Sequence, residues 1–292
     1  MSEGIDHTMR ELLRRNKYLK SLRRLSKGYT PVYIEYDITF KPRWVDDIGN
    51  PYLAKIISRA EETYQKNLKS LATYVPIVKK INNNEFPFKI DWHNHHMPAL
   101  DGFSLMWAAL RAKSTFMEIG SGNSTLFAKA ALVHENKSTK IISIDPAPRA
   151  QVDAVCDMII RKPLEDIDLS IFDELDAGDT LFVDNSHRSF MNSDVTTFML
   201  DVLPRLKPGV LVGVHDIFLP YDYFESWSER GYNEQYLLGC YLLSNPNYFD
   251  IQLSNYWISR NKMHHEPLKE IWDQLEGKIR DRLSSAFWGI KN

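Results

Sequence analysis

Two hydrophobic patterns alternate through the middle of the chain. Short apolar runs rich in Val, Ile, Leu and Phe predict buried strands, and longer segments with apolar residues at helical spacing predict helices between them. Strands are predicted at 115–119, 141–144, 159–160, 179–184, 210–214, 248–253 and 256–259, and helices at 103–112, 150–158, 164–175, 193–206 and 234–243, with another beginning near residue 124. This alternation predicts a doubly wound α/β domain, with a mostly parallel sheet covered by helices on both faces.

The two ends of the chain extend this core. Helical spacing is predicted at 1–27, 50–75 and 268–283, with an extended edge segment at 29–40. Residues 1–90 are therefore predicted to form an N-terminal helical cap, and residues 91–292 the main domain. The first helix is rich in lysine and arginine, so it is expected to dock on its own domain or on a second subunit, or else on an anionic membrane surface. The amphipathic ends are compatible with a homodimer.

Composition narrows the class of protein. The 292 residues are 43% hydrophobic and 25% charged, enough for a sizeable core. A net charge of −2 lacks the basic excess of a general nucleic-acid binder, so no nucleic-acid partner is expected. The only cysteines, Cys156 and Cys240, form no CxxC motif, and no apolar run reaches the roughly 18 residues of a membrane span. We therefore expect a cytoplasmic protein without a transmembrane segment.

The stretch 116–145 carries the most specific chemistry. It runs from a strand through a glycine turn into a helix and then a second strand, which places backbone amides where a nucleotide-like ligand binds. Thr125 replaces the third glycine of the dinucleotide pattern, and Glu118 stands two residues before Gly120. A carboxylate there opposes a pyrophosphate but suits the ammonium group of S-adenosylmethionine. Asp145 ends the second strand, where it can accept hydrogen bonds from ribose hydroxyls.

Acids and histidines follow the fourth and fifth predicted strands. Asp184, His187, His215 and Asp216 should meet at the carboxyl edge of the sheet. Methylation of a hydroxyl needs a base or a divalent ion to remove its proton, so His187 or His215 is a candidate base. Asp184, His215 and Asp216 are candidate ligands of magnesium. A purely structural role for this group is the third alternative.

Polar and aromatic residues near these strand ends are candidates for binding an acceptor. The candidates are Trp92, Asn94, Tyr221, Asp222, Tyr223 and Tyr236. Aromatic faces with nearby hydrogen-bonding groups suit a small molecule or sugar, although the tyrosines could instead close the core over the fifth strand. Trp92 and Asn94 lie in a loop with His93, His95 and His96, for which a metal site is a minor alternative to a pocket wall or a tether for the cap.

Several motifs together resemble the class I S-adenosylmethionine-dependent methyltransferases. They are EIGSGNST at 118–125, SIDP at 143–146, the acidic segment after Pro163, FVDNSH at 182–187 and VGVHDI at 212–217. The chain is most similar to the bacterial subgroup related to macrolide-sugar O-methyltransferases and cephalosporin-hydroxylase-like proteins. The resemblance covers residues 92–260 and leaves 1–90 unexplained. It implies a Rossmann-like seven-stranded sheet whose last strand is antiparallel.

The resemblance also implies a set of cofactor contacts. The methionine part would lie at Glu118, Gly120, Ser121, Gly122, Asn123 and Ser124, the ribose at Asp145 and Pro146, the adenine near Leu164, Glu165 and Asp166, with Asp184 completing the set. Related O-methyltransferases often carry Asp-Asn where this chain has His215 and Asp216. The expected function is O-methylation of a small-molecule or glycan-like hydroxyl. The alternatives are a hydroxylase-like oxidoreductase on the same scaffold and a non-catalytic nucleotide-binding protein.

Overall fold

The computed structural model describes residues 25–26, 32, 35, 38–94, 96–148 and 151–292. The chain separates into residues 1–41 and a compact unit of residues 42–292. The predicted helix at 1–27 and the predicted edge segment at 29–40 lie largely outside the described residues. The larger unit contains the predicted strands together with the helices predicted at 50–75, so these helices share one core with the sheet.

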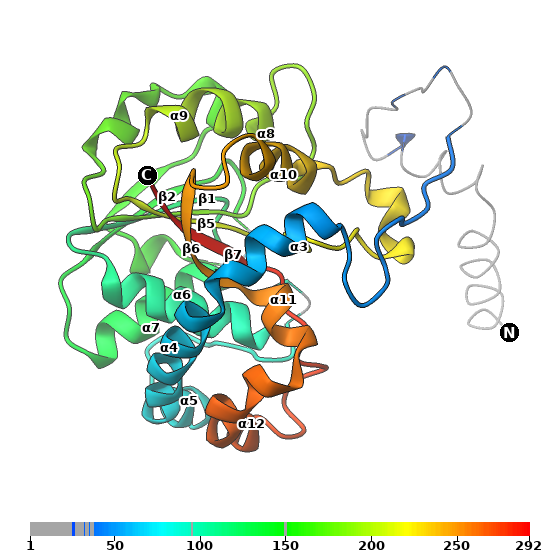
Figure 1. Cartoon of the computed structure of the whole chain (residues 1–292). Helices are drawn as coiled ribbons and strands as arrows, with labels where there is room; N and C mark the ends of the chain where they lie inside the picture. Colours follow the sequence, from blue (N-terminus) through cyan, green and yellow to red (C-terminus); the bar gives the residue numbers. More distant parts are fainter. Residues whose placement is uncertain (1–24, 27–31, 33–34, 36–37, 95, 149–150) are drawn as a thin grey trace, which may run out of the picture. The chain divides into compact units, whose positions relative to one another are not determined.

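A seven-stranded mixed sheet forms the centre of the larger unit, in the order β3-β2-β1-β4-β5-β7-β6 (Figure 1). The strands are β1 (Thr115–Ile119), β2 (Lys140–Ile144), β3 (Met158–Ile160), β4 (Thr180–Val183), β5 (Leu211–Val214), β6 (Phe249–Ser254) and β7 (Phe287–Lys291). Strands β1 to β5 run parallel to one another, whereas β7 runs antiparallel to both β5 and β6. The predicted doubly wound, mostly parallel sheet is confirmed.

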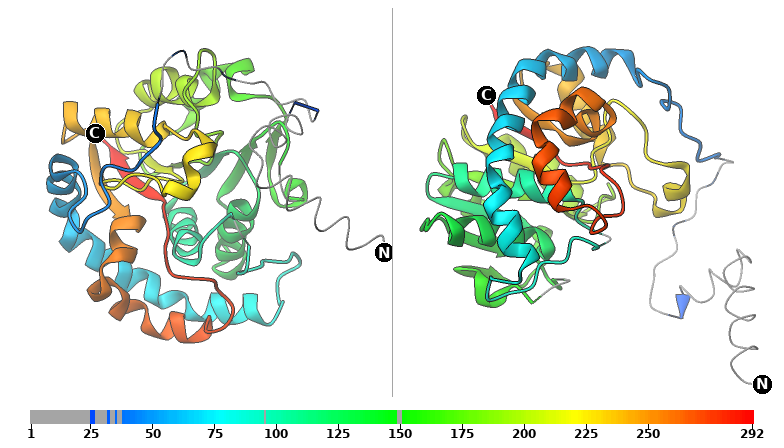
Figure 2. Two further views of the ribbon diagram at one scale, coloured as in Figure 1. Left: turned by 90° about the vertical axis from the view of Figure 1, so that its right-hand side faces the viewer. Right: turned by 90° about the horizontal axis from the view of Figure 1, so that it is seen from below.

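Helices cover both faces of this sheet (Figures 1 and 2). One face carries α6 (Ala99–Arg111) and α7 (Asn123–His134), with α4 (Glu61–Leu71), α5 (Val75–Asn82) and α12 (Lys269–Gln274) packed beside them. The other carries α8 (Asp194–Thr197), α9 (Leu203–Arg205) and α10 (Glu234–Ser244), and α3 (Pro51–Ile57) packs against α10. The ligand-binding edge of such a sheet is the one where its parallel strands end.

The central strands are apolar on both faces because helices cover both. Every residue of β4 and β5 is buried, which explains why they appear in the sequence as continuous apolar runs. The ring of Phe182 on β4 stacks on Trp288 of β7, with centroids 5.3 Å apart. Gly213 on β5 leaves room for this indole, because a Cβ there would lie 2.4 Å from it. The antiparallel strand is thereby packed into the centre of the core.

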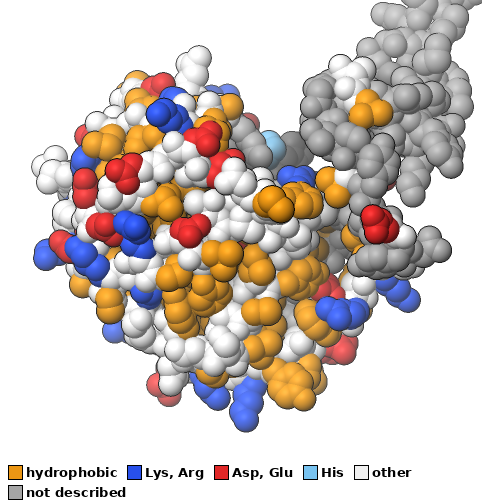
Figure 3. Space-filling view, turned by 90° about the horizontal axis from the view of Figure 1, so that it is seen from above, with side chains coloured by type: hydrophobic (Ala, Val, Ile, Leu, Met, Phe, Trp, Pro, Cys, Tyr) orange, Lys and Arg blue, Asp and Glu red, His pale blue; other side chains and the backbone are white. Residues whose placement is uncertain are grey.

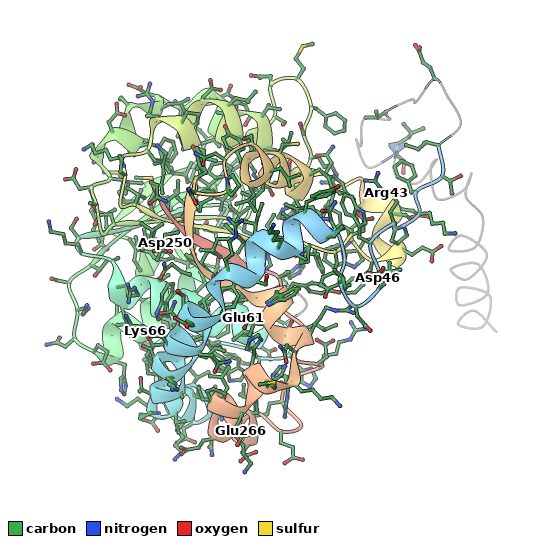
Figure 4. All side chains as sticks on the ribbon, in the orientation of Figure 1. Arg43, Asp46, Glu61, Lys66, Asp250 and Glu266 are labelled. Carbon is green, nitrogen blue, oxygen red and sulfur yellow. The ribbon has the colours of Figure 1, made fainter. Side chains whose placement is uncertain are left out.

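The helices of the predicted cap are bonded to the C-terminal half of the chain. Asn67 on α4 donates a hydrogen bond to the carbonyl of Gln252 on β6 (2.9 Å). Glu61, labelled in Figure 4, accepts one from the indole of Trp257 on α11 (Asn255–Arg260) and contacts Nε2 of His264, each at 2.7 Å. These buried and half-buried bonds fix α4 against the sheet.

The structure corrects several predicted elements. The segment 256–259 belongs to helix α11, and the seventh strand is instead β7 at the end of the chain. The described part of the helix predicted at 150–158 is instead irregular chain, a short 3-10 turn (Asp153–Val155) and the start of β3. The segment 164–175 forms two 3-10 helices (Leu164–Asp166 and Leu169–Glu174). Short apolar segments of this kind can form a helix or a strand, and tertiary packing decides which of the two forms.

The surface of the described residues carries charges of both signs. Seen from above (Figure 3), apolar side chains gather over part of the surface, and basic and acidic side chains lie interspersed around them. None of the helices among the described residues combines the length and apolar character that crossing a bilayer requires.

Candidate functional site

A pocket of about 460 Å³ lies at the carboxyl ends of β1, β2 and β4. Many of the predicted cofactor residues line it: Gly120, Ser121, Gly122, Asn123, Ser124, Asp145, Pro146, Leu164, Glu165 and Asp184. The lining also includes His96, Met97, Asn185, Ser186 and Asp194, which the sequence did not single out for cofactor binding. The volume is that of a small-molecule site.

Gly120 brings the ends of three strands together. Its backbone has φ of +77°, and its N–H donates to the carbonyl of Ile144 on β2 (2.9 Å). A Cβ on Gly120 would lie 1.8 Å from the main-chain oxygen of Asp184, directly after β4. Only glycine permits both the left-handed backbone and this close approach, so the turn has a structural reason that does not depend on any ligand.

Asp145, at the end of the neighbouring strand β2, stabilises the glycine turn through hydrogen bonds. One carboxylate oxygen accepts a hydrogen bond from the N–H of Ser121 and the other from the N–H of Ala147, both at 2.7 Å. Asp145 remains partly exposed to the pocket, so lone pairs are left for a ligand. Arg161 adds a positive charge behind it, donating to Ser143 (3.0 Å) and to the Asp145 carbonyl (3.2 Å).

Glu118 is fully buried beneath the glycine turn and does not line the pocket among the described residues. Oε2 accepts a hydrogen bond from the hydroxyl of Thr125, which itself accepts from the N–H of Gly122 (3.2 Å). Thr125, the residue in place of a third glycine, therefore ties the turn to the carboxylate. Burial raises the pKa of Glu118 to about 8, against hydrogen bonds from Ser124 and Thr125 that lower it. Oε1 of Glu118 is buried without a hydrogen-bond partner.

Leu164 and Glu165 close the far end of the pocket from a 3-10 turn. Leu164 is buried, and Oε2 of Glu165 is shielded from solvent without a hydrogen-bond partner. An apolar side chain beside an acceptor is a chemical fit for the flat, amino-bearing ring of an adenine.

Two histidines and two aspartates meet beside this pocket. Nε2 of His187 lies 3.2 Å from Oδ1 of Asp184 and 3.5 Å from Oδ2 of Asp216. Nδ1 of His215 lies 3.4 Å from Oδ1 of Asp184 and 3.7 Å from Oδ1 of Asp216. The structure thus brings together the four residues that the sequence placed at adjacent strand ends, and we call them the Asp–His cluster.

Each histidine has a second carboxylate behind its ring. Nδ1 of His187 lies 3.0 Å from Oε2 of Glu234 on α10, and Nε2 of His215 lies 3.3 Å from Oδ2 of Asp101 on α6. The sequence indicated neither Glu234 nor Asp101 as a partner of a histidine. A signal for Asp101 existed, since it is the only acid in the otherwise largely apolar helix α6.

The charges of the cluster support one another. Burial lowers the pKa of His187, but hydrogen bonds to Asp184 and Glu234 outweigh it and hold that pKa well above its usual value. Burial likewise lowers the pKa of His215, and the charges of Asp216 and Asp184 raise it well above the usual value. Burial raises the pKa of Asp184, but the two histidines hold it below the usual range. The cluster is therefore a set of mutually stabilised ion pairs.

Backbone strain accompanies this arrangement. His187 and Asp216 adopt φ of +61° and +54°, a left-handed conformation that side-chain-bearing residues seldom take. The other described non-glycine residues with positive φ are all asparagines, which tolerate it best: Asn84, Asn136 and Asn192. Strain of this kind concentrates where a fold must aim particular side chains.

The predicted acceptor residues do not line this pocket, as far as the described residues show. Asp222 accepts hydrogen bonds from the N–H groups of Arg43 and Trp44 and from the hydroxyl of Tyr236 (2.9 Å). Tyr221 and Tyr223 are buried with Phe218 and Tyr256 in an aromatic cluster. Tyr232 packs against this cluster, and its ring centroid lies 4.6 Å from that of His187. The sequence did not indicate that these two residues are neighbours.

Trp92 and Asn94 act within the fold. The buried Trp92 donates to Asn82 (3.1 Å) and packs on Phe103 and Phe127. Asn94 forms a turn, with Oδ1 accepting from the N–H of Met97, and so places His96 and Met97 at the pocket. His95 lies outside the described residues. A role for Trp92 or Asn94 in acceptor binding remains a prediction.

The predicted magnesium ligands are close together but contact histidines. Among the described residues, no group of three or more His, Cys, Asp or Glu side chains has the arrangement of a metal site. Asp184, His215 and Asp216 would have to exchange contacts within the cluster in order to bind one ion. Metal binding at these residues therefore remains a prediction.

Comparison with known proteins gives a match to one family model and similarity to solved structures of methyltransferases. No curated protein matches the chain. Among solved structures, the chain is similar to the plantazolicin methyltransferase BpumL in complex with SAH, at 13% identity over 82% of this chain and 99% of that one, with a TM-score of 0.40. It is also similar to phosphoethanolamine N-methyltransferase 2 of Haemonchus contortus in complex with S-adenosyl-L-methionine, at 14% identity over 68% and 54% of the two chains, with a TM-score of 0.34. Residues 117–217, from β1 through the Asp–His cluster, match the family model of a methyltransferase domain.

Proposed function

We propose that the chain is an S-adenosylmethionine-dependent methyltransferase that methylates a hydroxyl on a small-molecule or glycan-like acceptor. One observation carries the proposal: Asp184 both lines the pocket beneath the glycine turn and belongs to the Asp–His cluster. A cofactor pocket and a proton-handling group therefore share a residue. The family match over 117–217 supports the methyltransferase class, and the hydroxyl acceptor is inferred from the cluster.

The pocket residues fit this cofactor. Partly exposed Asp145 can accept hydrogen bonds from ribose hydroxyls, and Leu164 with Glu165 suits an adenine. Oε1 of Glu118, beneath the turn assigned to the cofactor's methionine part, is a buried oxygen without a hydrogen-bond partner. The bound cofactor would supply a methyl group on a positively charged sulfur.

The Asp–His cluster would receive the acceptor's proton. A hydroxyl beside Asp184 or Asp216 can donate a hydrogen bond to a carboxylate, which holds its oxygen in line for methylation. The proton released on methylation would pass to a carboxylate of the cluster, while Glu234 and Asp101 keep the two imidazole rings in place. A magnesium ion held by Asp184, His215 and Asp216 would acidify the same hydroxyl directly.

Binding of the cofactor tests the first half of the proposal. Calorimetric titration of the protein with S-adenosylmethionine should show saturable binding, and Asp145→Ala should weaken it by at least about tenfold through the lost ribose contacts. Asp250→Ala is the matched control, because Asp250 is an exposed acid on β6 at the far edge of the sheet (Figure 4). No binding at millimolar ligand would contradict the proposal.

Transfer to an acceptor tests the second half. With labelled S-adenosylmethionine and a panel of hydroxylated acceptors, Asp216→Ala should abolish transfer while cofactor affinity changes little, because Asp216 does not line the described cofactor pocket. Equal loss of both would show that Asp216 supports the cofactor site instead. Activity after treatment with EDTA separates the two routes: its loss, with recovery on added magnesium, supports the metal.

A further inference from the structure

Glu234, the first residue of α10, is a fully buried carboxylate. Its two oxygens have different partners. Oε1 accepts a hydrogen bond from the side-chain amide of Asn185 (2.8 Å), and Oε2 lies 3.0 Å from Nδ1 of His187. Glu234 therefore contacts two residues of the loop that follows β4.

The hydrogen bonds around Asn185 fix the direction of this contact. The backbone N–H of His187, which can only donate, bonds to Oδ1 of Asn185 (2.8 Å). The amide nitrogen of Asn185 must then be the atom that faces Glu234, so Oε1 of Glu234 is an acceptor. A reversed amide would place two donors together on one side and two acceptors on the other.

The same logic orients the His187 ring. An ionised Glu234 can only accept, so Nδ1 of His187 donates this contact, and the opposite nitrogen of the ring points to the front of the site. That nitrogen, Nε2, faces Asp184 and Asp216 at 3.2 and 3.5 Å. The loop adopts a left-handed backbone at His187, and Tyr232 packs against the ring on another side. These contacts together hold Nε2 of His187 toward Asp184 and Asp216.

We propose that Glu234, held by Asn185, is a positioning residue that fixes the orientation of the His187 ring for the proposed methyl transfer. The inference rests on the proposed function for its catalytic meaning. The pairing itself is a property of the free protein and can be measured without any acceptor. Glu234 does not line the described cofactor pocket, so its effect should appear in turnover and not in cofactor affinity.

The chain offers a matched pair as a control. Glu61 on α4 contacts Nε2 of His264 at 2.7 Å, so it is another carboxylate beside a buried imidazole, on the helices packed against the other face of the sheet (Figure 4). Glu61→Gln removes the same charge as Glu234→Gln without touching the site. If losing any Glu–His pair impairs the enzyme, turnover should fall in both variants. If Glu234 positions His187, turnover should fall only in Glu234→Gln.

The experiment records the ring nitrogens of the histidines by 15N NMR, with His187→Gln assigning the His187 signals. In the wild type Nδ1 of His187 should carry a proton, and Glu234→Gln should move the His187 signals to another tautomer or charge state. Glu61→Gln should move the His264 signals alone. With an acceptor from the panel, Glu234→Gln should lower kcat roughly 100-fold and leave the affinity for S-adenosylmethionine within about twofold.

An unprotonated Nδ1 in the wild type, or His187 signals unchanged in Glu234→Gln, would overturn the proposal. Should Glu234→Gln not fold, Glu234→Asp keeps the charge but withdraws it by one methylene, and the same His187 signals must then move. A wild type that shows the expected ring signals but transfers no methyl group would refute the proposed function and leave the Glu234–His187 pairing standing.

Discussion

Gly120 is the residue on which the pocket depends most directly. Gly120→Ala would combine a left-handed backbone with a Cβ 1.8 Å from the main-chain oxygen of Asp184, so the ends of β1 and β4 would have to separate. We expect a loss of more than about 3 kcal/mol in the free energy of unfolding, together with loss of cofactor binding. Urea denaturation measures the first and calorimetric titration the second.

Gly231 provides the control for this substitution. It has φ of +65°, but a Cβ there would meet nothing within 4 Å. Gly231→Ala should therefore cost only about 1 kcal/mol, the backbone contribution alone. Equal losses in the two variants would show that the contact with Asp184 has no energetic consequence.

Glu118 gives stability a specific dependence on pH. Its pKa is about 8 in the folded protein and near the ordinary value of 4.5 when unfolded, so between these limits the folded state binds the proton more tightly. Stability from this group is present below the unfolded pKa and is lost as pH rises toward 8, by at most about 1.4 kcal/mol per pH unit. Glu118→Gln, which stays neutral, should lose this slope relative to the wild type.

Urea midpoints of both proteins near pH 5 and near pH 8 measure this difference. Glu276→Gln, at an exposed acid, should keep the wild-type slope. A wild type and Glu118→Gln with parallel pH profiles would show that Glu118 is ionised in the folded protein.

At the scale of elements, α6 holds the C-terminal strand in place through Asp101. The Asp101 carboxylate accepts hydrogen bonds from the N–H groups of Ser285 and Ala286 and from the side chain of Asn255, besides facing His215. Asp101→Asn would turn one acceptor oxygen into a donor facing other donors. We expect a loss of about 3 kcal/mol, measured by urea denaturation.

The exposed pair Asp173–Arg205 (2.8 Å) supplies the comparison, because both side chains are more than one-third exposed. Asp173→Asn should cost less than about 1 kcal/mol. A similar small cost for Asp101→Asn would mean that β7 is held by its ladder and by Trp288 without help from α6.

The sequence predicted the parallel strands well because each is a short apolar run followed by a charged or glycine residue. Strand β1 was predicted with its observed bounds, and β2, β4 and β5 within a residue or so. The last two strands were not both predicted, because residues 256–259 and 287–291 have similar composition and only the packing of Trp288 on Phe182 selects the second. Antiparallel partners far apart in the sequence leave no local signal.

At the scale of the whole molecule, the site divides into a local part and a distant part. The turn, Asp145 and Asp184 lie at consecutive strand ends, so fold rules alone predicted where they meet. Glu234 and Asp101 reach their histidines across 47 and 114 positions of sequence, and no spacing in the chain indicates such pairs. For the tyrosines the sequence left two alternatives open, an acceptor pocket or closure of the core, and the structure buries Tyr221 and Tyr223.

Ligand binding should stabilise the whole compact unit. A ligand at 100 times its Kd adds about 2.7 kcal/mol to the free energy of unfolding, which for a domain of this size corresponds to roughly 5 °C or more in Tm. S-adenosylhomocysteine, the demethylated product, should therefore raise Tm of the wild type and of Asp250→Ala, and much less that of Asp145→Ala. Identical shifts in all three proteins would place the ligand away from β2.

Asp184 also sets a distance. Its main-chain oxygen rests against the glycine turn, and its side-chain Oδ1, five bonds away, contacts both histidines. In the proposed function, the length of this one residue would set the gap between the cofactor pocket and the proton-accepting carboxylates. Acceptor choice could then diverge through the surrounding loops and α10 while that gap is kept.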